Sequence, residues 1–260
     1  METTAYVLAR NEAVNIAECV RSLVAAGVPT TVLDSQSADS TRQLAQEAGA
    51  EVEDYRYTTH VEAYNWITRY RVPADAAAFV LDADMIVTRE LVAQATELVL
   101  AGAQAVLAPV RMYWNGRHLR FASLYPPKAV AFRGGTAHFE PAGHGERLVQ
   151  GTLTARTTAT VVHDDRKPFS AYLSAQDRYA RALVERSSRG AAAWRDRLRL
   201  WSPLLVVATP LVSYFVKGGI LDGRAGVGYA LDRLIAEAIM YRQALATRAT
   251  PAPRDAPRPR

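Results

Sequence analysis

The sequence contains a single cysteine, Cys19, among 260 residues. One cysteine excludes an internal disulfide, and its position in a predicted helix indicates a buried thiol in a reducing compartment. The amino-terminal segment METTAYVLARNEA has no basic stretch followed by an apolar one. We therefore expect no signal peptide and a cytoplasmic location.

The sequence also lacks a long uninterrupted apolar run. Its most hydrophobic stretch, residues 198–216, contains Arg199, Pro203 and Pro210, whereas a spanning helix needs about 20 apolar residues. The preceding AAAWRDRLRLW interleaves tryptophan and leucine with arginine, a pattern that suits a membrane interface. Over 191–217 we predict contact with a membrane surface, on the inner face of the cell membrane; the alternative is a buried helix pair with an arginine-rich outer side.

Acidic residues are absent between Leu98 and Phe139. The net charge of the chain is +5, and the Pro-rich stretch 248–260 contributes four arginines and one aspartate to it. We expect that tail to be disordered. The charge that remains on the body is too small to indicate nucleic acid as a partner. The acid-free segment predicts either a solvated basic face or a surface that meets phosphates. Its cations are Arg111, Arg117, Arg120, Lys128 and Arg133.

Hydrophobic periodicity predicts an α/β fold with a mostly parallel sheet and helices on both faces. Short apolar runs alternate with amphipathic segments through the first hundred residues, and three more strand-like segments precede residue 168. We predict a catalytic domain over 1–168, a helical region over 169–247 and the tail over 248–260. The expected strands of the first part are 5–9, 30–35, 50–55 and 77–84, and the expected helices are 11–27, 38–49, 60–70 and 88–102.

Two carboxylates, Asp82 and Asp84, end the fourth predicted strand. Residues i and i+2 of a strand point to the same side, so both carboxylates can face one point. Like charges this close repel each other unless a proton or a cation lies between them. The alternative is an Asp-rich turn after a buried strand. In a parallel sheet ligands bind at the carboxyl ends of the strands, where Asp34 also lies.

Four segments resemble family 2 glycosyltransferases of the GT-A fold, and among them the bacterial lipopolysaccharide-core or capsule glucosyltransferase-like group. The likeness extends over about residues 5 to 230, and the order and spacing of the segments make it more specific than any one of them. The segments are LARNEAVNIAECVRSL, VLDSQSADSTRQLAQEAGAEV, FVLDADMIVTREL and HDDRKPFSAYLSAQDRYARAL.

The resemblance implies a nucleotide-sugar donor and a divalent cation, Mn²⁺ or Mg²⁺, for which hard oxygen ligands are suited. It implies that Asp84 binds the metal and that Asp82 lies against the ribose, the metal or its water. Asp34 corresponds to the position that hydrogen-bonds uracil. A third metal ligand would be His163, unless that histidine is bonded in the core or starts a helix. Arg10, Asn11 and Glu12 correspond to the loop bordering the nucleotide.

An inverting transfer also needs a general base. Glu146 ranks first, Asp164 second and Asp165 third, and each could instead be a surface carboxylate. Related sequences often place His and Glu side by side, and here Gly145 separates them. Arg166 and Lys167 could meet the diphosphate or neutralise the two carboxylates before them.

The expected function is metal-dependent, inverting transfer of a sugar from a nucleotide sugar, with UDP as the expected nucleotide. The expected acceptor is a glycan or a lipid-linked molecule in cell-envelope or exopolysaccharide synthesis. A nucleotidyltransferase would need a Gly-rich basic loop after the first strand, and ARNEA lacks the glycines. A dehydrogenase would need Gly-X-Gly-X-X-Gly there. An inactive scaffold that recruits polysaccharide enzymes is the remaining alternative.

Overall fold

A seven-stranded mixed sheet forms the centre of the protein. The computed structural model describes residues 3–249 except 58, 75, 143, 144, 191 and 193, with only the backbone at 142, 145, 195, 248 and 249. The strand order is β12-β6-β9-β4-β1-β2-β3, and β9 alone runs antiparallel to its neighbours. The predicted α/β class is confirmed. The strands are β1 (Thr3–Ala9), β2 (Thr30–Asp34), β3 (Glu51–Asp54), β4 (Ala77–Asp82), β6 (Ala105–Ala108), β9 (Lys128–Arg133) and β12 (Thr154–Arg156).

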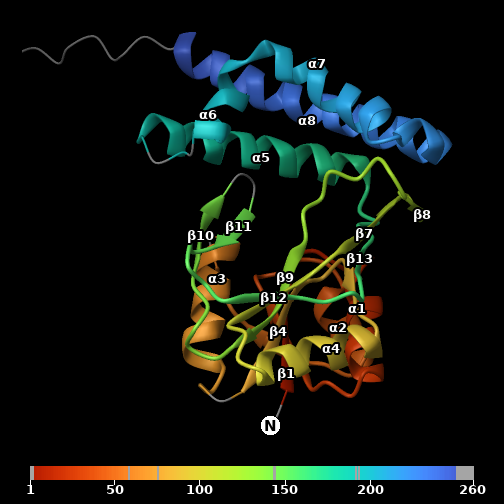
Figure 1. Cartoon of the computed structure of the whole chain (residues 1–260), viewed down its shortest axis with the longest axis vertical. Coiled ribbons are helices and arrows are strands. Elements are labelled where there is room, and N and C mark those ends of the chain that lie inside the picture. Colours follow the sequence, from red (N-terminus) through yellow and green to blue (C-terminus); the bar gives the residue numbers. More distant parts are fainter. Residues whose placement is uncertain are drawn as a thin grey trace, which may run out of the picture.

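Helices cover both faces of this sheet, as predicted (Figure 1). Along β4, Phe79 and Leu81 join the buried cluster beneath α1, α2 and α4, whereas Val80 joins the cluster beneath α3. This alternation places apolar side chains on both sides of a central strand. The helices are α1 (Ile16–Ala25), α2 (Thr41–Glu47), α3 (His60–Trp66), which continues as the π-helix η1 (Ile67–Arg71), and α4 (Arg89–Leu100).

Two of the predicted boundaries that differ from the structure lie at the carboxyl edge of the sheet. The helix expected from residue 11 begins at Ile16, because Asn11 has a φ of +55° and cannot be helical. The fourth strand ends at Asp82 and not at Asp84. The residues Asp82-Ala83-Asp84 turn the chain into β5 (Met85–Ile86), which leaves the main sheet. Both irregular segments therefore form loops where ligands bind in such sheets.

A second, smaller sheet joins β5 to strands from the later part of the chain. Its order is β5-β13-β7-β8, and a separate hairpin pairs β10 with β11. The pairing of β13 with β5 sets His163 opposite Met85, one residue beyond Asp84. These strands are β7 (Val110–Trp114), β8 (Arg117–His118), β10 (Phe139–Ala142), β11 (Gly145–Leu148) and β13 (Val161–His163).

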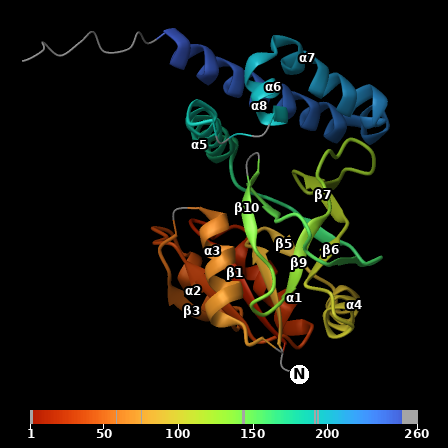
Figure 2. The same ribbon diagram turned by 60° about the vertical axis from the view of Figure 1, so that its left-hand side comes forward.

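The remaining helices form a layer beyond the carboxyl edge of the sheet (Figures 1 and 2). Whether the boundary predicted at residue 168 separates two domains stays a prediction. From residue 250 on, the predicted tail lies outside the described residues. The layer contains α5 (Phe169–Ser188), α6 (Trp194–Trp201), α7 (Pro203–Leu211), which continues as the π-helix η2 (Val212–Val216), the 3₁₀ helix η3 (Gly219–Asp222) and α8 (Gly223–Ala249).

The membrane contact predicted for the arginine-rich segment 191–217 stays a prediction. Trp194 and Trp201 are exposed, but the guanidinium of Arg199 forms an ion pair with the buried carboxylate of Glu237 on α8. Arg199 therefore helps to hold α6 on α8 and does not belong to an outer basic face. Over the described residues, no single helix is long and apolar enough to cross a membrane.

The helical layer contacts the small sheet through a close approach at Gly228. A Cβ there would lie 2.2 Å from the ring of Trp114, whose Nε1 donates to Asp232 Oδ2 at 2.7 Å. We expect Gly228→Val to destabilise the protein by about 1–3 kcal/mol through overpacking. Thermal denaturation should show a lower Tm, by about 2–4 °C per kcal/mol for a chain of this size. The exposed neighbour provides the control: Val227→Ala should leave Tm nearly unchanged, and an equal loss in both variants would contradict the packing argument.

Candidate metal and nucleotide site

Asp82 is paired with a buried lysine that sequence reasoning did not assign to the site. Lys128, the first residue of β9, places Nζ 3.0 Å from Asp82 Oδ2 and 2.6 Å from Glu146 Oε1. The Nδ1 atom of His60 lies 3.5 Å from Asp82 Oδ1. Lys128 was expected on a solvated basic face or a phosphate-binding surface, and it lies instead in the interior, between two carboxylates. The antiparallel strand β9 brings it there.

The two aspartates have opposite pKa shifts. Burial by itself would raise the pKa of Asp82, but the charge of Lys128, with a further contribution from His60, lowers it to about 2. Burial raises the pKa of Asp84, and the charge of Asp82 adds to the rise, while His163 opposes it. Asp82 thus has its cation within the protein, whereas no Lys or Arg of the described residues forms an ion pair with Asp84. Asp82 and Asp84 therefore differ in the charge that surrounds each carboxylate.

Asp84 faces His163, and both retain unused polar atoms. Asp84 Oδ2 lies 3.6 Å from His163 Nε2, and the ring of Tyr125 lies 5.0 Å from that of the histidine, centroid to centroid. Asp84 Oδ1 and His163 Nδ1, and also Asp82 Oδ1, are buried without a hydrogen-bond partner among the described residues. Buried polar atoms are usually satisfied, so such orphans indicate a missing ligand. Carboxylate and imidazole at this spacing fit one divalent cation.

The protein supplies few ligands for such a cation. Within the described part of the chain, no three His, Cys, Asp or Glu side chains converge as a metal-binding group. A Mg²⁺-like cation is commonly held by one or two carboxylates, with water and substrate phosphates completing its octahedron. Asp84 and His163 suit that sparse type of site. A structural zinc site would need four protein ligands.

Asn15 fastens the segment after His163 to the start of α1. Its Nδ2 donates to Asp165 Oδ1 at 3.0 Å, and its Oδ1 accepts from the backbone N–H of Arg166 at 3.1 Å. Beside it, Lys167 Nζ lies 2.5 Å from Glu12 Oε1. Burial raises the pKa of Glu12 to about 7, against the lowering effect of Lys167. The structure therefore brings Glu12 and Lys167 to the site edge as a pair.

The candidate bases lie in different surroundings. Glu146 is bound to Lys128, close to Asp82. Asp164 is buried, accepts from Arg166 Nε at 2.8 Å and keeps Oδ1 without a partner. Asp165 is more exposed and is held by Asn15. Arg166 thus forms an ion pair with Asp164, and neutralising the preceding carboxylates was one of its two predicted roles. Its Nη1 also lies 2.6 Å from Glu18 Oε2. Glu146 therefore lies near Asp82, because both bind Lys128, and Asp164 lies near Asp84, whose carbonyl accepts from the Asp164 N–H.

The loops after β1 and β2 are bonded to each other at the same sheet edge. The backbone N–H of Asn11 donates to Ser37 Oγ at 2.8 Å, and Asn11 Oδ1 accepts from the N–H of Ala38 at 2.8 Å. Buried Asp34 accepts from the hydroxyl of Ser37 at 2.5 Å and from Arg42 at 3.3 Å. Arg10 is exposed beside them. In the structure Asp34 shapes the loop; its predicted contact with uracil stays a prediction.

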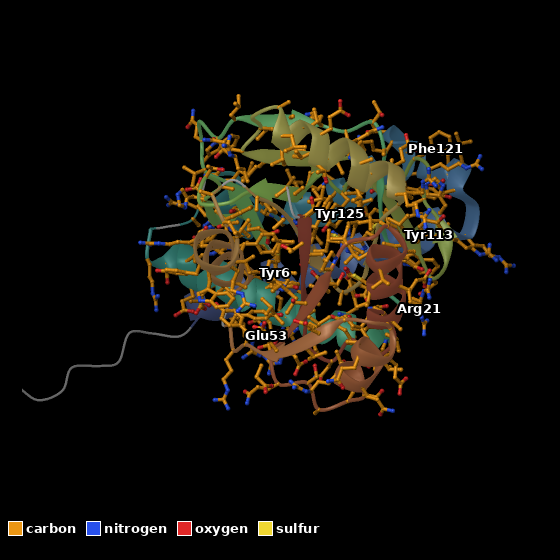
Figure 3. All side chains as sticks on the ribbon, turned by 90° about the horizontal axis from the view of Figure 1, so that it is seen from below. Tyr6, Arg21, Glu53, Tyr113, Phe121 and Tyr125 are labelled. Atoms are coloured by element: carbon orange, nitrogen blue, oxygen red, sulfur yellow. The ribbon has the colours of Figure 1, made fainter. Side chains whose placement is uncertain are left out.

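Sequence reasoning missed Lys128 as a partner of the aspartates, and Tyr125 beside His163. Figure 3 shows Tyr125 toward the middle of the molecule, whereas Tyr113 lies toward its edge. Lys128 stands out in the sequence only as a lysine at the start of an apolar run, AVAF. A cation that begins a buried strand needs a partner of opposite charge. This position at the start of AVAF was the sequence signal that could have assigned Lys128 to the site.

Comparisons with known proteins find similar folds among solved structures. A mycobacterial protein is 18% identical over 70% of this chain and 74% of its own, with a TM-score of 0.49. Glucosyl-3-phosphoglycerate synthase from Mycobacterium tuberculosis, in complex with Mn²⁺, UDP and glucosyl-3-phosphoglycerate, is 18% identical over 69% and 77% of the two chains, with a TM-score of 0.46. Likenesses of this size do not establish function. No family model and no curated protein matches this chain.

Proposed function

We propose that the protein is a metal-dependent, inverting glycosyltransferase, similar to family 2, that takes a sugar from a nucleotide sugar. The observation that carries the proposal is the asymmetry of the aspartate pair. Lys128 neutralises Asp82, whereas Asp84 has only the imidazole of His163 as an ion-pair partner among the described residues. Buried polar atoms of both aspartates and of His163 remain without a hydrogen-bond partner in the same part of the chain. This arrangement at the carboxyl edge of a mostly parallel sheet suits a cation shared with a bound ligand.

Each residue then has a separate task. Asp84 and His163 would hold Mn²⁺ or Mg²⁺, which when bound supplies positive charge to a diphosphate leaving group. Lys128 keeps Asp82 ionised and oriented, so that Asp82 can accept a hydrogen bond from a ribose or a metal-bound water. The loops that contain Asn11 and Asp34 border the nucleotide. Glu146, whose Oε1 lies 2.6 Å from Lys128 Nζ, is our first choice of base for the acceptor hydroxyl.

The finer assignments are also proposals. We propose a UDP-linked donor, with Arg166 and Lys167 at the edge where its diphosphate would enter. The proposed acceptor is a glycan or a lipid-linked glycan of the cell envelope or an exopolysaccharide. The location would be the cytoplasm, with peripheral contact at the inner face of the membrane. Exposed Trp194 and Trp201 support that contact, although Arg199 does not.

Calorimetry with UDP tests the proposal. We expect the protein to bind UDP with MnCl₂ present, and at least about tenfold more weakly in EDTA, since a bridging cation binds protein and diphosphate together. ADP serves as the matched nucleotide control. Equal binding of UDP with and without the metal would contradict the metal site, and no uptake of either nucleotide would favour the scaffold alternative.

A further inference from the structure

Five large apolar side chains are exposed together where α7 and η2 turn toward α8. Val216 and Leu221 are 77% and 71% exposed, so most of their surface has no contact within the chain. The loop after β8 contributes one side chain, and the turn contributes four. Isolated exposed apolar residues are ordinary, but a contiguous group of them indicates an interaction site. We call this group the apolar tip; it consists of Phe121, Phe215, Val216, Ile220 and Leu221.

The apolar tip is held in place by the protein. The carboxylate of Asp222 accepts from the backbone N–H groups of Arg120, Phe121 and Ala122 at 2.9, 3.0 and 2.8 Å. Ser213 Oγ donates to the carbonyl of Ala122 at 2.7 Å. The loop after β8 and the turn between the helices therefore form one unit. Figure 1 shows β8 beneath that end of the helical layer, and Figure 3 shows Phe121 at the edge of the molecule.

Cations surround the apolar tip. Arg117, Arg120, Lys217 and Arg224 are exposed, and none of them forms an ion pair with any described residue. Asp222, the acidic residue within 117–122 and 213–224, already accepts three N–H groups. The tip thus presents exposed apolar side chains, and the four exposed cations close to them in the chain outnumber the single carboxylate of Asp222.

The apex of a bent helix pair coincides with the apolar tip. The helical stretches Pro203–Val216 and Gly219–Thr247 are together apolar enough to pass a composition test for membrane segments, but they meet at 71°. The break between them falls at Lys217 and Gly218, inside the tip. The most apolar helical segments of the described chain thus form a sharp bend and not a straight helix that could span a bilayer.

We propose that the apolar tip inserts into the surface of an anionic lipid bilayer, while the surrounding cations bind the lipid phosphates. Aromatic and aliphatic side chains enter the interfacial region, and each nearby Lys or Arg is attracted by anionic headgroups. A second copy of the chain is a poorer occupant of this face. In a two-fold interface the same patch meets itself, so the four cations of each copy would face those of the other.

Membrane docking would place the bilayer near the candidate metal site. Tyr125 follows Phe121 by four residues, so their Cα atoms are at most about 14 Å apart. The ring of Tyr125 contacts that of His163. A lipid-linked acceptor in the bilayer could therefore present its head group to the site; this consequence rests on the proposed function, whereas the insertion does not.

Vesicle co-sedimentation of the full chain tests the insertion. We expect the protein to sediment with vesicles of equal parts phosphatidylcholine and phosphatidylglycerol at least about tenfold more strongly than with phosphatidylcholine alone. Binding should weaken as salt rises. The double variants Val216→Ser/Leu221→Ser and Lys217→Glu/Arg224→Glu should each lose at least about tenfold in binding. Leu153→Ser, a substitution at a 61% exposed leucine before β12, is the matched control and should bind as the unmodified chain does.

Three results would overturn the insertion. The first is absence of the chain from the pellet of anionic vesicles. The second is unchanged vesicle binding by both double variants. The third is a dimer, seen by light scattering without lipid, that the Val216→Ser/Leu221→Ser substitutions convert to a monomer. Circular dichroism confirms that the variants are folded. UDP calorimetry on the unmodified chain separates the two proposals. Vesicle binding without metal-dependent UDP uptake supports insertion and contradicts the glycosyltransferase, whereas UDP uptake without vesicle binding contradicts insertion and supports the glycosyltransferase.

Discussion

Asp84→Ala is expected to abolish metal-dependent sugar transfer while leaving the fold intact. The substitution removes one of the two ligands that we propose, and His163 by itself would hold a hard divalent cation weakly. Loss of positive charge at a leaving group should lower the rate by at least about 10²–10³-fold, as when one preorganised electrostatic partner is removed. The measurement is release of UDP from a UDP-sugar at saturating MnCl₂, with Mn²⁺ affinity determined separately by electron paramagnetic resonance.

The thermal stability of this variant separates a metal defect from a folding defect. Burial raises the pKa of Asp84, so ionising it is unfavourable in the metal-free protein. Its removal should therefore leave the metal-free Tm unchanged or higher. Glu97→Ala, at an exposed carboxylate of α4, is the control and should retain full turnover. Undiminished turnover in Asp84→Ala would refute the metal role.

Lys128→Met is expected to destabilise the protein strongly at neutral pH. It leaves Asp82 and Glu146 buried without their common cation. Breaking a buried ion pair by removing one partner typically costs about 3–5 kcal/mol. Sugar transfer should fall as well, since Asp82 would no longer be held ionised and oriented. Thermal denaturation and UDP release measure the two effects.

The pH dependence of that loss identifies its cause. In the unmodified chain Asp82 has a pKa lowered to about 2, so its contribution to stability is present above the ordinary carboxyl pKa and is lost only as the pH falls toward 2. Without Lys128, burial raises the pKa of Asp82, and protonation relieves the unpaired charge. The Tm gap between the two proteins should therefore be smaller at mildly acidic pH than at neutral pH.

Two further variants complete the experiment. Lys128→Met/Glu146→Gln should recover part of the stability, because one of the two stranded charges is gone. Arg133→Met, on the same strand, should cost much less, since its guanidinium donates to the carbonyl of Ala74 at the exposed end of the sheet. A Tm gap for Lys128→Met that is constant with pH would show that lost packing, and not charge, causes the destabilisation.

The sheet was predictable because its signals are local. Runs such as AYVLA and AAFVLDAD contain their own strand pattern, and their alternation with amphipathic segments implies a parallel order. The aspartates could be placed at the carboxyl edge for the same reason. The helix at residue 11 was mispredicted because apolar periodicity does not register the positive φ of Asn11, which two bonds to the loop after β2 stabilise.

The partners of the aspartates could not be predicted, because they depend on pairings between distant segments. Lys128 reaches Asp82 only because β9 inserts antiparallel between β4 and β6. Its neighbours in the sequence are the cations of the acid-free segment, which suggested a surface. The inward turn of Arg199 toward Glu237 is a similar case, since a helical pattern shows which face is charged but not what packs against it.

The Asn15 contact has a consequence for how the protein would acquire the proposed metal. Asn15 and Asp165 are separated by 150 positions, and their bond fixes the segment that contains His163. Contacts between residues so distant in the chain close large loops, and the entropy of loop closure makes them slow to form. The first proposed ligand, Asp84, belongs to the early strands, whereas the second, His163, comes only with the last strand of the small sheet. During biosynthesis, therefore, a nascent chain released before that strand would fold much of its sheet and still fail to retain Mn²⁺, and metal uptake would mark the completed molecule.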